Sequence, residues 1–300
     1  MSTAKYFPSV ENIQKAAKVL TEIIEPTPFL LNAHLSTTYG ADVFLKREDL
    51  QMVRSYKIRG AYNKIRSIDP ETLKYGIVCA SAGNHAQGVA FSCNKLHIMG
   101  SIYMPTTTPK QKIEQVRMFG KEYIDIVLTG DTFDAANAAA MEFARKSGKT
   151  FIPPFDDPKI MEGQGTIGCE IMEQTKEALD YIFIPIGGGG LASGLGAYIK
   201  QMSPETKIIG VEPAGAPCMK AAIDKGEVVE LENINKFVDG AAVKKAGAQT
   251  YEVCKEILDD IIVVPEGAVC TTIINLYNKS AIVVEPAGAL SIAADRKSVV

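Results

Sequence analysis

The sequence predicts a two-lobed α/β fold in which mainly parallel sheets are covered by helices. Short apolar segments of strand length alternate with longer amphipathic segments along most of the chain. Glycine-containing turns follow two of the apolar segments, at Ser81–Gly83 and Gly187–Gly190. A proline-rich stretch, Phe151–Pro158, interrupts the alternation near mid-chain. We therefore expect residues 76–152 to form a small lobe inserted into a large lobe of residues 1–75 and 153–300.

Each expected strand is a short, mostly apolar run. The expected strands are residues 41–45, 76–80, 100–104, 124–128, 150–152, 181–186, 207–211 and 261–264. The helical periodicity gives helices at residues 9–24, 55–68, 84–93, 109–118, 132–147, 160–175, 191–201 and 267–280. Ser9 and Ser55 stand at helix starts, where a hydroxyl caps free N–H groups. Strand–helix alternation favours parallel pairing, which places ligands at the carboxyl ends of strands.

Composition and charge argue against several classes of protein for this chain. Hydrophobic residues make up 46% and charged residues 22% of the 300, and the formal net charge is −3, so nucleic acid and anionic membranes are not expected partners. No apolar run is long enough to span a bilayer, and residues 1–7 lack a signal-peptide core, so we expect a cytoplasmic protein. The six cysteines form no C-x-x-C pair and the three histidines no ligand pattern, so we expect reduced thiols and no metal.

Basic residues gather in one stretch of the sequence. They are Lys46, Arg47, Arg54, Lys57, Arg59, Lys64 and Arg66. Charge alone favours a solvated helix face for this group.

The glycine run Gly187–Gly190 joins an expected strand to an expected helix. Glycine lets the backbone approach a ligand closely, and the free N–H groups of a helix start favour an anion, most often phosphate. A nicotinamide-binding site is the alternative, with Glu212 as the ribose ligand. The spacing G-G-G-G-x-x-x-G departs from the dinucleotide pattern G-x-G-x-x-G, and no Gly-Lys-Ser/Thr follows to form a P-loop.

Four segments together carry a family resemblance. S-Y-K-I-R-G-A begins at Ser55, S-A-G-N-H-A-Q-G at Ser81, G-Q-G-T at Gly163, and G-G-G-G-L at Gly187. They resemble the signature segments of the fold type II enzymes that use pyridoxal 5′-phosphate (PLP), whose fold is like that of the tryptophan synthase β chain. Within that group the chain resembles the threonine dehydratase (threonine ammonia-lyase) family, its biosynthetic branch in particular, from Thr27 to the E-P-A-G-A at Glu285.

The resemblance implies roles for individual residues. Lys57 would bond covalently to the PLP aldehyde and then serve as the general base. The other implied cofactor-binding residues are Asn84 at the ring hydroxyl, Gly187, Gly188, Gly189, Gly190 and Leu191 at the phosphate, and Gly240 and Glu285 near the ring. The implied substrate-carboxylate loop is Ser81, Ala82, Gly83, Asn84 and His85, where a structural hydrogen bond is an equal alternative for His85.

The implied reaction is the conversion of L-threonine to 2-oxobutanoate and ammonia, and of serine to pyruvate, in isoleucine biosynthesis. Related racemases carry a second acid/base serine where this chain has Ala82, and β-replacing synthases carry Asn-Pro where it has Met52–Arg54, so elimination is favoured. Alternatives are a serine racemase or serine dehydratase, a nicotinamide-dependent dehydrogenase, and a non-catalytic binding module.

The resemblance also has implications for metal binding, for the C-terminal end of the chain and for the oligomeric state. Some relatives bind a cation through the residue that corresponds to Glu212 and a second carboxylate, but no second carboxylate follows here, so no metal is expected. The chain stops at Ser298–Val300, so we expect that the end of the large lobe and any regulatory domain are missing. Relatives of this kind form homo-oligomers, dimers or tetramers.

Overall fold

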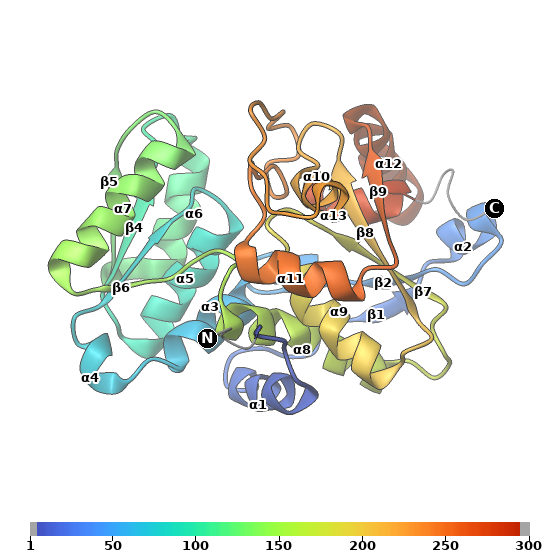
Figure 1. Ribbon diagram of the computed structural model, residues 1–300, viewed down its shortest axis with the longest axis horizontal. Helices are drawn as coiled ribbons and strands as arrows, with labels where there is room; N and C mark the ends of the chain where they lie inside the picture. The colour runs from blue at the N-terminus through green and yellow to red at the C-terminus, as the bar shows by residue number, and fades with distance from the viewer. Residues whose placement is uncertain (1–4, 295–300) are drawn as a thin grey trace. The chain divides into compact units, whose positions relative to one another are not determined.

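The computed structural model describes residues 5–294 of the chain. Their contacts divide them into two compact units, which Figure 1 shows. The large unit comprises residues 5–17, 25–50 and 155–294 of this range, and the small unit comprises residues 18–24 and 51–154. Within residues 5–294, no helix combines the length and apolar character needed to cross a membrane.

The small unit is built on a four-stranded parallel sheet. Its strand order is β5-β4-β3-β6, with β3 Ile77–Ala80, β4 Gly100–Met104, β5 Ile124–Leu128 and β6 Thr150–Phe151. Its helices are α3 Lys57–Arg66, α4 Pro70–Leu73, α5 Asn84–Leu96, α6 Lys110–Gly120, η2 Lys121–Tyr123 and α7 Phe133–Ser147. Every residue of β3 and β4 is buried, as expected for parallel strands covered on both faces.

Residues 51–75 lie in the small unit, although the sequence analysis grouped them with the large lobe. The reason is that α3 packs directly on α5. A Cβ atom on Gly88 of α5 would lie 3.1 Å from the backbone of Lys57 and Ile58. Ile58 and Tyr62 of α3 join one apolar cluster with Phe91 of α5. The later boundary, between residues 154 and 155, falls inside the expected proline-rich stretch.

The large unit is built on a three-stranded parallel sheet. Its order is β7-β8-β9, with β7 Tyr181–Pro185, β8 Lys207–Pro213 and β9 Asp260–Val264. A separate antiparallel pair joins β1 Phe29–Leu31 to β2 Phe44–Lys46. Its helices are α2 Ala33–Tyr39, η1 Glu48–Leu50, α8 Pro158–Gln174, α9 Gly190–Met202, α10 Cys218–Lys225, α11 Ala248–Ile257, α12 Glu266–Ser280 and α13 Pro286–Ala293. Helix α1, Val10–Leu20, begins in the large unit and ends in the small one.

Helices α8 and α9 approach each other so closely that their contact requires glycine. A Cβ atom on Gly194 of α9 would lie 2.0 Å from the carbonyl oxygen of Met161 on α8. A Cβ atom on Gly165 of α8 would lie 3.0 Å from the carbonyl oxygen of Gly194. The G-Q-G-T segment of the sequence therefore serves, at Gly165, to let α8 lie against the helix that follows the glycine run.

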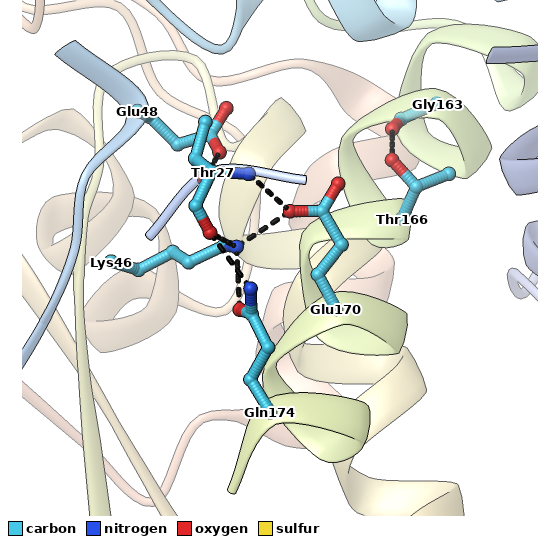
Figure 2. Close-up of polar contacts among 7 residues, drawn as sticks. All are labelled: Thr27, Lys46, Glu48, Gly163, Thr166, Glu170 and Gln174. Carbon is cyan, nitrogen blue, oxygen red and sulfur yellow. Dashed lines mark hydrogen bonds and ion pairs between the residues drawn. The ribbon is translucent and has the colours of Figure 1, made fainter. Parts of the chain in front are cut away.

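The hypothesis that the basic residues form a solvated helix face is wrong for two of them. Arg59 is only 1% exposed in the small unit. Lys46 in the large unit keeps only 9% of its side chain exposed and forms an ion pair of 2.5 Å with Glu170 of α8. Its Nζ also donates to the Thr27 carbonyl at 2.7 Å and to Gln174 Oε1 at 2.9 Å, and Figure 2 shows these groups converging on the amine. Burial of the charge is possible because the ammonium has three acceptors for its three N–H bonds.

Candidate active site

Lys57 is the first residue of α3 in the small unit. Its Nζ donates a hydrogen bond to the Pro154 carbonyl at 2.9 Å and lies 5.5 Å from the centroid of the Tyr56 ring. The chain turns three residues earlier, at Arg54, which has a left-handed φ of 60°. The amine is therefore held in a defined place at the start of a helix rather than extended into solvent.

The loop Ser81–Asn84 lies at the carboxyl end of β3 and leads into α5. Ser81 Oγ accepts a hydrogen bond from the Gly83 N–H at 3.2 Å. Gly83 is the N-cap of α5 and has no side chain to satisfy the first N–H groups of the helix. The N-terminus of a helix attracts a carboxylate, which is the role that the resemblance implies for this loop.

His85 is buried in the first turn of α5, with 4% of its surface exposed. Its Nε2 lies 3.0 Å from the Ile152 carbonyl oxygen, so this nitrogen carries the proton and donates. Burial, helped by the positive charge of Lys57, lowers the pKa of His85 to about 3. The structure thus supplies the structural hydrogen bond that the sequence analysis weighed, and the neutral ring is not an acid at physiological pH.

The lowered pKa of His85 predicts a loss of stability in acid. The unfolded histidine binds a proton below about pH 6.5, whereas the folded one does not until about pH 3, so stability falls as the pH drops from 6.5 towards 3. At pH 5 the penalty is about 2 kcal/mol relative to pH 7.5. The measurable effect is the difference between two proteins in urea unfolding at both pH values: on going from pH 7.5 to pH 5, stability should fall by about 2 kcal/mol more in the parent than in His85→Gln, which keeps a donor for Ile152. An equal acid loss in the variant would contradict the prediction.

The glycine run lies between β7 and α9 in the large unit, and its carbonyl groups are held by the protein. The carbonyls of Gly187, Gly188 and Gly189 accept from Cys218 Sγ at 3.5 Å, Thr250 Oγ1 at 2.6 Å and the Ser193 N–H at 2.8 Å. In a trans peptide the C=O and the following N–H point in opposite directions, and no cis peptide occurs in residues 5–294. The N–H groups of residues 188–190 therefore point away from these partners.

These three N–H groups are available to an anion, and we call them the cradle. Within residues 5–294 none of them donates a hydrogen bond to the protein, although Gly188, Gly189 and Gly190 are buried. Side chains are excluded as well, because a Cβ atom on Gly188 would lie 2.3 Å from the Phe155 ring and Gly189 has a φ of 92°. Free N–H groups at the start of α9 suit the binding of a phosphate group.

Two further predicted cofactor-binding residues lie together in the large unit. A Cβ atom on Gly240 would be 3.3 Å from Glu285 Oε1. Leu191 follows the glycine run in the first turn of α9 and is buried. These positions agree with a shared site, but their contacts with a cofactor remain predictions.

Glu212, the ribose ligand of the nicotinamide alternative, is turned into the protein. Its side chain has no exposed surface, and its two carboxylate oxygens accept from the N–H groups of Met219 at 2.8 Å and Lys220 at 2.7 Å. Burial raises the pKa of Glu212 to about 7 despite these hydrogen bonds. The carboxylate caps α10 and is not available to a ribose. Over residues 5–294 no three His, Cys, Asp or Glu side chains gather in a metal-binding group, and the expected absence of a metal stays a prediction.

Three residues that hold Lys57 and the glycine run in place were not predicted from the sequence. Pro154 orients the Lys57 amine, Phe155 packs against the glycine run, and Thr250 holds one of its carbonyls. The only local signal was the proline-rich stretch Phe151–Pro158, which was interpreted as a boundary alone.

Comparison with known proteins gives the class of cofactor. Residues 20–298 match the family model described as "Pyridoxal-phosphate dependent enzyme". This chain belongs to the pyridoxal-phosphate dependent enzyme family. Its cofactor is PLP, in agreement with the reactive lysine and the phosphate cradle that the sequence predicted.

Curated relatives of this PLP-dependent enzyme are named biosynthetic L-threonine dehydratase IlvA. The protein of that name from Halalkalibacterium halodurans is 58% identical over 285 residues, which are 95% of this chain and 69% of the relative. The one from Bacillus subtilis is 53% identical over 285 residues, which are 95% of this chain and 68% of the relative.

Solved structures of PLP-dependent enzymes share the fold. The processed form of threonine deaminase isoform 2 from Solanum lycopersicum has a TM-score of 0.89 and 40% identity, and the match covers 97% of this chain and 86% of that one. Maize serine racemase has a TM-score of 0.92 and 30% identity, with coverage of 97% and 87%. The predicted α/β class with parallel, helix-covered sheets is confirmed.

Proposed function

We propose that this PLP-dependent enzyme removes water and ammonia from L-threonine to give 2-oxobutanoate, and acts on L-serine to give pyruvate. The observation that carries the proposal is the 58% identity, over 95% of the chain, to a protein named biosynthetic L-threonine dehydratase. Synthesis of isoleucine is the proposed use of the product, because the relatives are named biosynthetic.

The proposed cofactor-binding and substrate-binding residues are those that the family resemblance implies. Lys57, Asn84, the glycine run with Leu191, Gly240 and Glu285 bind PLP, and residues 81–85 bind the substrate carboxylate. Within the small unit Lys57 donates to the Pro154 carbonyl, and within the large unit Phe155 packs against Gly188. The free N–H groups of residues 188–190 support the phosphate assignment.

The proposed mechanism assigns proton transfer to Lys57. PLP, when bound, supplies an electron sink that acidifies the hydrogen on the substrate α-carbon. The Lys57 amine removes that proton and carries it on Nζ, oriented by the Pro154 carbonyl. The N-terminal turn of α5 neutralises the substrate carboxylate, while the neutral His85 keeps that turn fixed to Ile152. The β-hydroxyl takes up the proton carried on Nζ and leaves as water, and the enamine product reacts with water to give the 2-oxo acid and ammonia.

Racemisation is the nearest alternative, because maize serine racemase shares the fold at 30% identity. It requires a second proton donor on the opposite face of the reacting carbon. The family resemblance places that donor at residue 82, where this chain has alanine, which has no ionisable group. Elimination is therefore the reaction that this sequence favours.

The deciding experiment measures ammonia and 2-oxo acid released from threonine and from serine with PLP supplied. We expect turnover of both, with kcat/KM about tenfold or more higher for threonine, because one methyl group in a fitted site is worth about 1–3 kcal/mol. Production of D-serine without 2-oxo acid would reject the proposal in favour of a racemase.

We also propose a cytoplasmic homo-oligomer, a dimer or tetramer. The cysteines of residues 5–294 are all free thiols, which fits a reducing compartment. Ile274 and Tyr277 lie one turn apart on α12 with 58% and 63% of their surface exposed, and such apolar surface commonly marks a subunit contact. A molar mass of a single chain by light scattering would reject the oligomer.

A further inference from the structure

The N-terminal end of helix α11 donates hydrogen bonds to the glycine run. The Gly188 carbonyl accepts two hydrogen bonds, from Thr250 Oγ1 at 2.6 Å and from the Gly247 N–H at 3.3 Å. Thr250 has no exposed surface, so neither water nor a ligand reaches its hydroxyl. Both donors come from the N-terminal end of α11, which is distant in sequence from the glycine run.

The start of α11 is itself held by one carboxylate. Asp156 Oδ2 accepts from the Ala248 N–H at 3.0 Å, and Oδ1 accepts from the N–H groups of Gln249 at 2.9 Å and Thr250 at 3.1 Å. Asp156 thus caps three free N–H groups of the helix from a segment 92 residues away. The approach is close, because a Cβ atom on Gly247 would lie 2.5 Å from the Asp156 carboxylate.

These contacts fix a peptide that glycine would otherwise leave free to rotate. The peptide between Gly188 and Gly189 has a glycine on each side, so its plane rotates at little steric cost. Two donors on the Gly188 carbonyl hold that plane, and the Gly189 N–H then points the opposite way, into the cradle. Without the donors the same N–H has no fixed direction.

We propose that Thr250 and Asp156 are positioning residues for the cofactor phosphate: Asp156 places the start of α11, and Thr250 aims the Gly189 N–H by holding the Gly188 carbonyl. Neither residue is required to touch the cofactor. The inference rests on the proposed role of the glycine run in binding the PLP phosphate, and it deepens that role by naming what gives the cradle its shape.

The test compares PLP with pyridoxal, which has the same ring and aldehyde but no phosphate. Holoenzyme is stripped with hydroxylamine and retitrated with each compound while absorbance and fluorescence are followed. Thr250→Val should weaken PLP binding about tenfold and leave pyridoxal binding unchanged, because it removes the buried hydrogen bond that holds the Gly188 carbonyl, and pyridoxal has no phosphate for the cradle to bind. Thr250→Ser keeps the hydroxyl and should restore PLP affinity to within about twofold.

A matched control distinguishes loss of the Thr250 contact with the glycine run from loss of a threonine hydroxyl elsewhere. Thr271→Val removes a hydroxyl that donates to the Gly267 carbonyl at 3.0 Å in α12, and it should change neither affinity. Asp156→Asn removes the negative charge that caps α11 and should weaken PLP binding about fivefold, again without effect on pyridoxal. The ³¹P chemical shift of bound PLP should move in both Thr250→Val and Asp156→Asn.

Equal loss of PLP and pyridoxal in the folded Thr250→Val protein would overturn the proposal, because it would indicate a general structural role. An unchanged PLP affinity would overturn it too. If Thr250→Val does not fold, the ratio of PLP to pyridoxal affinity in Asp156→Asn, together with its ³¹P shift, decides the question by the same criteria. If the wild-type enzyme binds PLP no better than pyridoxal, the proposed phosphate role of the glycine run is rejected. If the enzyme acts on another substrate than threonine, the ratios of PLP to pyridoxal affinity stay the same, so the two failures can be distinguished.

Discussion

Replacing Lys57 with alanine is expected to eliminate turnover of threonine and serine. The variant lacks the amine that Pro154 holds at the start of α3, and with it both the covalent attachment of PLP and the general base. Loss of the base alone lowers the rate by about 10²–10⁴-fold, and loss of covalent attachment adds to this. Ammonia release, together with the visible absorbance of the bound cofactor, measures the effect.

The control for that variant is Lys74→Ala. Lys74 is another lysine of the small unit, with 66% of its side chain exposed and an ion pair to Glu71. Its loss should leave both absorbance and turnover at the level of the parent enzyme. Turnover by Lys57→Ala above about one hundredth of the parent rate would contradict the assignment of the base.

Replacing Lys46 with methionine is expected to cause the largest loss of stability. The change leaves the Glu170 carboxylate buried without its cation and takes a donor from the Thr27 carbonyl and from Gln174. Removal of one partner from a buried ion pair costs about 3–5 kcal/mol. Urea unfolding of the holoenzyme should show this loss in the midpoint with little change in slope.

Two further variants test the cause of that loss. Lys46→Met combined with Glu170→Leu removes both charges and should recover part of the stability, since no unpaired charge remains buried. Lys220→Met breaks an exposed ion pair with Asp224 on α10 and should cost no more than about 1 kcal/mol. Similar losses for Lys46→Met and Lys220→Met would show that burial of the Lys46–Glu170 pair has no special effect.

Strands β3, β4 and β8 of the two parallel sheets were predictable because nearly all of their residues are buried. The continuous apolar runs at β3, β4 and β8 need only local composition to be recognised, and the structure has them within a few residues of the expected positions. The antiparallel partner β1 was missed, because three residues of its sequence carry no pattern of their own. Its pairing with β2 depends on tertiary contacts.

Helix α11 shows why other elements could not be predicted. Its start carries no side-chain cap of its own, since the N-cap is Gly247. The cap comes from Asp156, which is distant in the sequence, so no local window contains both the helix and the group that stabilises its start. The role of Thr250 behind the glycine run was hidden for the same reason.

The glycine run and Lys57 were predictable from the sequence to different degrees. The four glycines indicated a phosphate site by their chemistry alone, and the orientation of the Gly188 carbonyl agrees with it. Lys57 could not be separated from the other basic residues by charge or spacing, and only the family resemblance singled it out. Burial of Lys46 and Arg59 was unpredictable, because a lysine or arginine in a sequence does not reveal whether acceptors surround it.

The most direct test of the account is to find which side chain carries the cofactor. Holoenzyme is reduced with borohydride, digested and examined by mass spectrometry for a peptide that bears the reduced phosphopyridoxyl group. The account predicts a single modified residue, Lys57, within the segment Ser55–Arg59. Stoichiometric modification of any other lysine, with Lys57 unmodified, would contradict it.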